Sequence, residues 1–97
     1  MIVSMRGDGL MELSEAIVIR IKQIMKNKNM KLYDLSILSG VQRSTLSLFL
    51  NRSTKTIRLE NLLYICEALD IELKDFFNDK VFENVEAKNW LKKTEDE

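Results

Sequence analysis

The spacing of the apolar residues is the feature that most limits how this chain can fold. Over 14–28 and again over 59–69, apolar side chains recur on one face of a helix. The chain has no proline and only three glycines, so few residues would interrupt a helix. These features predict an all-α protein. With 45% apolar residues, the 97-residue chain can form one domain around a modest core.

We expect five helices, at about 14–28, 32–39, 43–51, 59–69 and 73–77. The second should bury Leu35 and Leu38. Gly40 should end it, because a left-handed residue just past a helix end is most easily a glycine. The first and fourth helices should form most of the core through their apolar stripes, which are Leu13, Ile17, Ile21, Ile24 and Met25, then Leu62, Ile65, Cys66 and Leu69.

The ends of the chain differ from this helical region. Residues 1–11 have little periodicity and are predicted to be a flexible N-terminal arm, leaving 12–77 as the helical domain. Residues 78–97 form an acidic C-terminal tail in which Phe82, Val85, Trp90 and Leu91 follow no clean repeat. Two interpretations of this tail stay open: it forms a surface for a dimer or another partner, or it folds back on its own core.

Charge is distributed unevenly although the chain is neutral overall. Between Arg20 and Arg58 there are nine Lys or Arg residues and one acid, Asp34, a net charge of +8 that the rest of the chain balances. Such a segment can attract a polyanion. The alternative is a solvated basic face without a ligand, and charge alone does not decide between them.

The composition argues against several other classes of protein. There is no histidine, no phosphate-binding glycine loop and a single cysteine, so we expect no enzyme activity, no metal site and no cofactor. Cys66, within an apolar stripe, is predicted to be a core residue. The apolar runs are far too short for a membrane span, and no secretory signal is evident, so we expect a cytoplasmic protein without membrane contact.

The segment 35–51 contains the most informative motif. It predicts two short helices, joined by about three residues around Gly40, that can pack at a steep angle with the second one projecting outward. On a helical wheel, one side of 43–51 carries Leu46, Phe49 and Leu50. The remaining surface lacks any carboxylate and consists of Arg43, Ser44, Thr45, Ser47, Leu48 and Asn51. Because a carboxylate would be repelled by phosphates, this surface suits a nucleic acid.

The ordered set of residues resembles the Cro/repressor-type, or XRE-like, helix-turn-helix regulators over about 17–77. The matching pieces are Leu35-Ser36, Ser39-Gly40-Val41, Ser44-Thr45-Leu46-Ser47, Asn51, Leu59 to Leu63, Ile65 to Ile71 and Leu73 to Phe77. The resemblance implies a five-helix bundle of the lambda-repressor-like DNA-binding type, from a bacterium or phage. It also implies that helix 43–51 enters the major groove of double-stranded DNA, usually in a homodimer on a near-palindrome.

Site residues follow from the resemblance, position by position. Base edges would face Arg43, Ser44, Thr45, Ser47 and Leu48. An arginine can bind guanine with two hydrogen bonds, hydroxyls can bond to several bases, and a leucine can cover a thymine methyl. Phosphates would face a second set, which is Lys31, Asn51, Arg52, Lys55 and Arg58.

Each of these assignments has a plainer alternative. Serine and threonine near a helix start often cap the helix, and single exposed leucines or arginines are common. The sequence also departs from the family pattern at four positions. Gln42 replaces a capping Ser or Thr, Lys31 replaces a polar cap that Asp34 can compensate, Arg52 replaces a common Gly, and Ile57 replaces a common Pro.

These features predict a sequence-specific transcriptional regulator, most simply a repressor that binds a palindromic operator as a homodimer. The alternative is a protein-interaction module, such as an antitoxin or anti-regulator, that binds a partner through the acidic residues 78–97.

Overall fold

A computed structural model describes residues 11–85 of the chain. Its elements are α2 (Leu13–Asn27), α3 (Leu32–Ser39), α4 (Arg43–Leu50), α5 (Leu59–Ala68), α6 (Leu73–Phe76) and a 3-10 turn, η1 (Lys80–Phe82). Within 11–85 the only β interaction is one parallel bridge between Met11 and Val85. The all-α prediction is confirmed, and the five predicted helices match the observed ones within one residue at each end.

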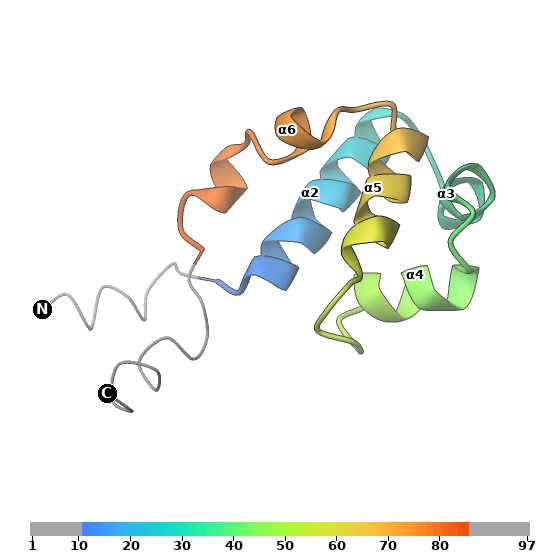
Figure 1. Cartoon of the computed structure of the whole chain (residues 1–97), viewed down its shortest axis with the longest axis horizontal. Helices are drawn as coiled ribbons and strands as arrows, with labels where there is room; N and C mark the ends of the chain where they lie inside the picture. Colours follow the sequence, from blue (N-terminus) through green and yellow to red (C-terminus); the bar gives the residue numbers. More distant parts are fainter. Residues whose placement is uncertain (1–10, 86–97) are drawn as a thin grey trace, which may run out of the picture.

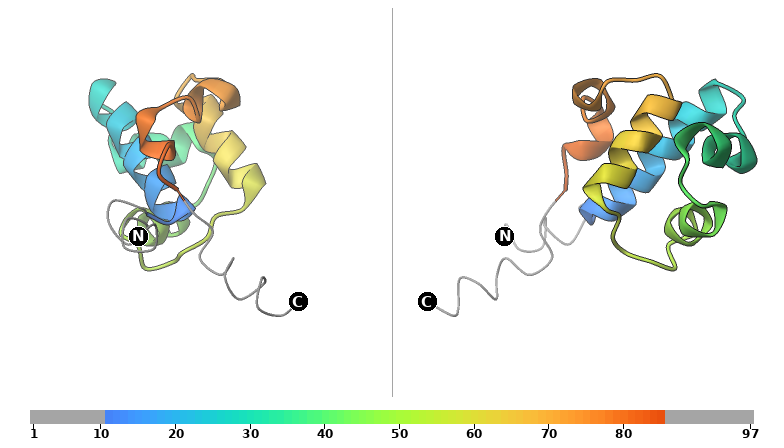
Figure 2. Two further views of the ribbon diagram at one scale, coloured as in Figure 1. Left: turned by 90° about the vertical axis from the view of Figure 1, so that its left-hand side faces the viewer. Right: turned by 45° about the vertical axis from the view of Figure 1, so that its right-hand side comes forward.

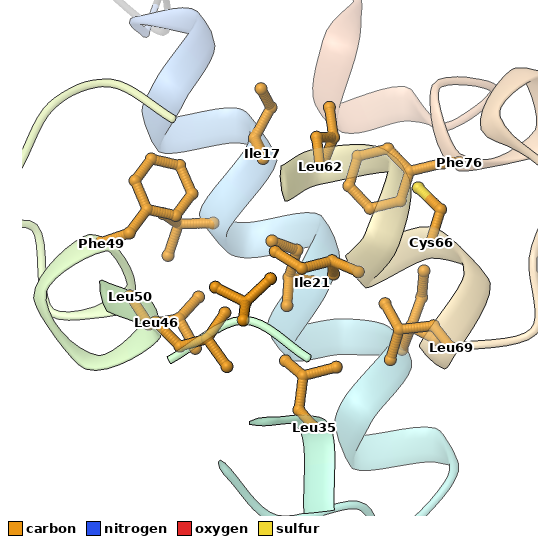
Figure 3. Close-up of a cluster of buried hydrophobic side chains, with 14 residues drawn as sticks. Ile17, Ile21, Leu35, Leu46, Phe49, Leu50, Leu62, Cys66, Leu69 and Phe76 are labelled. Atoms are coloured by element: carbon orange, nitrogen blue, oxygen red, sulfur yellow. The ribbon is translucent and has the colours of Figure 1, made fainter. Parts of the chain in front are cut away.

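The five helices surround one core, with α2 and α5 side by side at its centre (Figures 1 and 2). α3 packs against both α5 and α4, at the end of the molecule away from α6. The core side chains come from all five helices and converge between α2, α4 and α5 (Figure 3). Those that are almost completely buried are Ile21, Leu35, Leu46, Phe49, Leu62, Ile65, Cys66, Leu69 and Phe76.

The prediction for Leu38 is wrong, since this side chain is 60% exposed. α3 is apolar on nearly every side, so periodicity cannot select the face that will be buried. The structure turns Leu35 and the small side chains of Ser36 and Ser39 inward, which lets α3 lie close to its neighbours. Leu13, predicted on the core face of α2, is also half exposed.

The segment that follows α6 folds back onto α2. Phe82 packs against Phe76 and Phe77, with ring centroids 6.0 and 4.9 Å apart. Arg20 of α2 fastens this segment by donating hydrogen bonds from Nε to the Phe76 carbonyl, at 2.7 Å, and from Nη2 to the Asp75 carbonyl, at 2.9 Å. Phe82 and Val85 thus follow the fold-back interpretation of the tail.

The two ends of the described chain meet. The Met11 N–H donates to the Asn84 carbonyl at 3.1 Å, so Met11 belongs to the folded unit and not to a free arm. The remainder of the predicted arm, and Trp90 and Leu91 of the tail, lie outside the described residues. None of the helices within 11–85 has the length and apolar character that a membrane span needs.

Candidate nucleic-acid interface

The turn between α3 and α4 depends on Gly40. This residue has φ +78°, in the left-handed region that L side chains rarely adopt, and its N–H donates to the Ser36 carbonyl at 3.0 Å. The next N–H, of Val41, donates to Ser39 Oγ at 3.1 Å. The Val41 side chain is buried in the core and so anchors the turn between the two helices. Gly40 therefore ends α3 as the sequence predicts.

α4 is fixed by the side chains on its inner face. Leu46 and Phe49 are each 1% exposed, and Leu50 also lies in the core cluster (Figure 3). Because these buried residues share one side of the helix, the rotation of α4 about its own axis is determined. The opposite side of α4 must then face solvent.

That outward side contains the predicted base-contact residues. Arg43, Ser44 and Thr45 are exposed, Ser47 is half-buried, and Leu48 is 45% exposed. α4 contains no acidic residue. The structure therefore brings these five side chains together on one accessible, carboxylate-free surface.

Four of the predicted phosphate-contact residues are exposed and lie on segments that precede α3 or follow α4. Lys31 directly precedes α3, and Lys55 and Arg58 belong to the loop between α4 and α5. Arg58 makes one weak ion pair, 3.5 Å from Glu60, and both side chains are largely exposed. The side-chain oxygen of Asn51 accepts a hydrogen bond from the Ser53 N–H at 2.9 Å, which shapes the start of this loop.

Arg52 differs from the other four because its guanidinium is bound within the chain. Nη1 donates to Ser14 Oγ at 2.9 Å, and Nη2 lies 3.2 Å from Glu12 Oε1. Its backbone has φ +70°, which explains why a glycine suits this position. Contacts with the start of α2 thus hold a non-glycine residue in a left-handed conformation. A phosphate contact by Arg52 stays a prediction, and both Nη atoms already have partners.

The two helices of the motif begin differently. At the start of α3, Asp34 Oδ2 accepts a hydrogen bond from the Lys31 N–H at 3.0 Å, so Asp34 compensates for the missing polar cap. At the start of α4, the Gln42 side chain makes no capping hydrogen bond. The first turn of α4 therefore has N–H groups without a side-chain partner.

Comparison with known proteins agrees with this geometry. The family model of the Cro/C1-type HTH DNA-binding domain matches residues 20–80, which is more than half of the chain. The chain belongs to the Cro/C1-type helix-turn-helix family. Neither the curated proteins nor the solved structures gave a match. Membership of this family supports a DNA-binding regulator, and α3, Gly40 and α4 form the helix-turn-helix.

Cys66 of the Cro/C1-type domain has no exposed surface. Burial raises the pKa of its thiol to about 11, and the nearby Arg20 charge lowers it less. The thiol is therefore protonated at neutral pH and packs as a small apolar group. Its predicted place in the core is confirmed. Within 11–85, no three His, Cys, Asp or Glu side chains are grouped so that they would hold a metal ion.

Two basic residues of this Cro/C1-type domain make hydrogen bonds within the chain that were not predicted from the sequence. Arg20 and Arg52 were counted among the charges of the basic segment, whereas both guanidiniums bind groups of the same chain. For Arg20 a signal existed: it lies three residues after Ile17 and four before Ile24, on the apolar face of α2. Nothing in the local pattern marks Arg52, because its partners are 38 and 40 residues away.

Proposed function

We propose that this Cro/C1-type protein is a sequence-specific transcriptional regulator that represses genes by binding near-palindromic operators as a homodimer. The observation that carries the proposal is the division of α4 into a buried apolar side and an exposed side without carboxylates. A helix held in this way can enter the major groove without carrying a negative charge toward the phosphates.

Base recognition would come from the outward face of α4. Arg43, at its first position, can donate two hydrogen bonds to guanine O6 and N7. Ser44, Thr45 and Ser47 offer short hydroxyls that fit more than one base, and Leu48 offers an apolar contact for a thymine methyl. Arg43 is thus expected to contribute most of the discrimination.

Phosphate contacts would come from both sides of α4. Lys31 lies before α3, while Asn51, Lys55 and Arg58 follow α4. Such contacts fix the position of α4 on the duplex and supply affinity that depends on salt. We keep Arg52 as a weaker member of this set, because binding a phosphate there competes with Ser14 and Glu12.

The proposals of a homodimer and of repression are supported by how such domains read DNA. A two-fold symmetric dimer places two copies of α4 on half-sites about 34 Å apart, one turn of the duplex. A dimer bound across a promoter would exclude the polymerase, and the protein would act in the cytoplasm, where bacterial DNA lies.

The test is to select bound sites from a random DNA pool and to measure affinity for the best site at rising salt. With about eight phosphate contacts in a dimer, the affinity should fall by about 10³–10⁵-fold between 50 and 200 mM salt. Lys55→Ala should make this dependence shallower. An affinity that salt does not change would contradict the proposal, and selected sites without two-fold symmetry would contradict the homodimer.

A second candidate, a protein-interaction module such as an antitoxin or anti-regulator, is favoured by one observation. α3 exposes Tyr33, Ile37 and Leu38 by 59–63%, and these side chains line a surface groove of about 420 Å³. The predicted use of the acidic tail has to be tested on a shorter segment, because residues 78–85 pack into the domain. If this candidate holds, Ile37→Asp should abolish partner capture at this groove and spare DNA binding, and removing 86–97 tests the predicted use of the acidic tail.

A further inference from the structure

An apolar groove lies beside the start of α2 and extends to the loop that contains Lys55, one of the proposed phosphate contacts. It holds about 480 Å³, and its lining residues come from the start of α2, the loop before α5, α5 itself and Phe77. They are Glu12, Leu13, Ser14, Ile17, Lys55, Thr56, Ile57, Leu59, Leu62 and Phe77. The groove has the size that takes one bulky apolar group.

Two leucines at this groove are unusually accessible. Leu59 is 83% exposed and Leu13 is 50% exposed, although they flank a part of the core formed by Ile17 and Leu62. A single exposed leucine needs no explanation, but two of them at the rim of an apolar groove mark a surface that gains free energy when it is covered.

The direction of the chain at Val85 suggests an occupant for the groove. The bridge between Met11 and Val85 is parallel, and the Met11 N–H is bonded to the Asn84 carbonyl. The chain at Val85 therefore runs in the same sense as the chain at Met11. From Met11 that direction leads directly to Glu12 and Leu13, which line the groove.

The length of the remaining segment distinguishes this groove from the apolar groove on α3. Trp90, the only tryptophan of the chain, lies five residues after Val85 and so can reach about 17 Å from it. The groove on α3 includes Lys28, which directly follows the last residue of α2. Along this helix of 15 residues, Lys28 lies about 22 Å from Leu13. Of these two grooves, the one beside Leu13 and Leu59 is therefore the nearer to Val85.

We propose that residues 86–97 dock on their own molecule, with the indole of Trp90 in the groove between Leu13, Ile57 and Leu59. A second copy of the chain is a poorer occupant, because a stable dimer needs about 800 Å² from each partner, more than a groove lined by ten residues provides. The docked segment would also brace the loop that contains Lys55 and Arg58. The docking itself is independent of DNA binding, so it can fail while the regulator proposal stands.

The experiment uses the fluorescence of Trp90 in the full chain without DNA. A docked indole should emit at shorter wavelength than N-acetyltryptophanamide, and acrylamide should quench it several-fold less efficiently. Leu59→Glu should shift the emission to longer wavelength and raise the quenching toward that of the free analogue. The matched control is Leu38→Glu on α3, also a largely exposed leucine, which should leave both values unchanged.

Three results would overturn the proposal. Emission and quenching like those of the free analogue in the unaltered chain would show that Trp90 is not docked. Protection that survives Leu59→Glu would place Trp90 elsewhere, and protection that disappears on dilution would assign the groove to a second copy. Circular dichroism checks that each variant is folded, and Leu59→Gln serves as the milder variant if Leu59→Glu is not.

Discussion

α3 and α4 are both eight residues long, and they present opposite kinds of surface. The outward side of α4 has Arg43 and hydroxyl side chains, with Leu48 as its one large apolar residue. The outward side of α3 exposes Tyr33, Ile37 and Leu38. A polar, carboxylate-free helix suits a DNA groove, whereas the apolar one suits another protein.

The difference also shows when burial can be inferred from sequence. In α4 the apolar residues Leu46, Phe49 and Leu50 gather on one side, so the inward face is already defined in the isolated helix. In α3 apolar residues occur all round, so the contacts with α4 and α5 decide which of them are buried.

The largest expected effect separates the inner and outer faces of α4. Phe49→Ala should lower the free energy of unfolding by about 3–5 kcal/mol, because it leaves a cavity in the core. Leu48→Ala, on the exposed side, should change it by less than about 0.5 kcal/mol. Urea unfolding measures both. For α3, Leu35→Ala and Leu38→Ala should divide in the same way, and equal losses within either pair would mean that the helix is rotated from its described position.

A new carboxylate should distinguish the outer face of α4 from that of α3. Ser47→Asp should weaken DNA binding by about 1–4 kcal/mol, through repulsion between the added charge and the phosphates. Ile37→Asp adds the same charge to α3 and should leave affinity nearly unchanged. Electrophoretic mobility shifts at constant salt measure both. If the α3 variant lost as much affinity as the α4 variant, the DNA would have to contact both helices.

A side chain on the left-handed residue at the end of α3 should destabilise the protein. Gly40→Ala should destabilise the protein by about 1–2 kcal/mol, because alanine resists φ +78°. An added Cβ would meet no atom within 4 Å, so the cost is one of backbone conformation and not of packing. Thermal unfolding checks this, and an unchanged melting temperature would show that the turn adapts.

Arg52 is the left-handed residue that follows α4, as Gly40 follows α3. Its substitution should have the smallest effect. Arg52→Ala keeps the backbone strain and loses the bonds to Ser14 and Glu12, so stability should fall by about 1 kcal/mol. Arg52→Gly loses the same bonds and relieves the strain, so it should remain close to the original protein. If the alanine variant proved as stable as the original, the bonds to Ser14 and Glu12 would contribute nothing.

Much of the fold was predictable because its signals are local. Helix bounds follow from apolar spacing, and the end of α3 from the conformational freedom of Gly40. The outward position of Arg43, Ser44 and Leu48 followed from the wheel of α4 alone. The sequence of one helix is enough to predict its buried face when its apolar residues gather on one side.

The features that the sequence left undetermined, and the wrong prediction for Leu38, depend on distant residues. The solvent exposure of Leu38 depends on how α3 meets α4 and α5. The Arg52 guanidinium binds Ser14 and Glu12 at the start of α2, which are far away in the sequence. The packing of Phe82 depends on Phe76 and Phe77, and it joins residues 78–85 to the domain.

The central claim is that the outer face of α4 reads bases, and the most direct test compares Arg43→Ala with the unaltered protein on two DNAs. One is the selected operator, and the other is an unrelated duplex of equal length at the same salt concentration. We predict a loss of about 1–3 kcal/mol on the operator and a far smaller change on the unrelated duplex. Equal losses on both would contradict base reading and would reduce Arg43 to a phosphate contact.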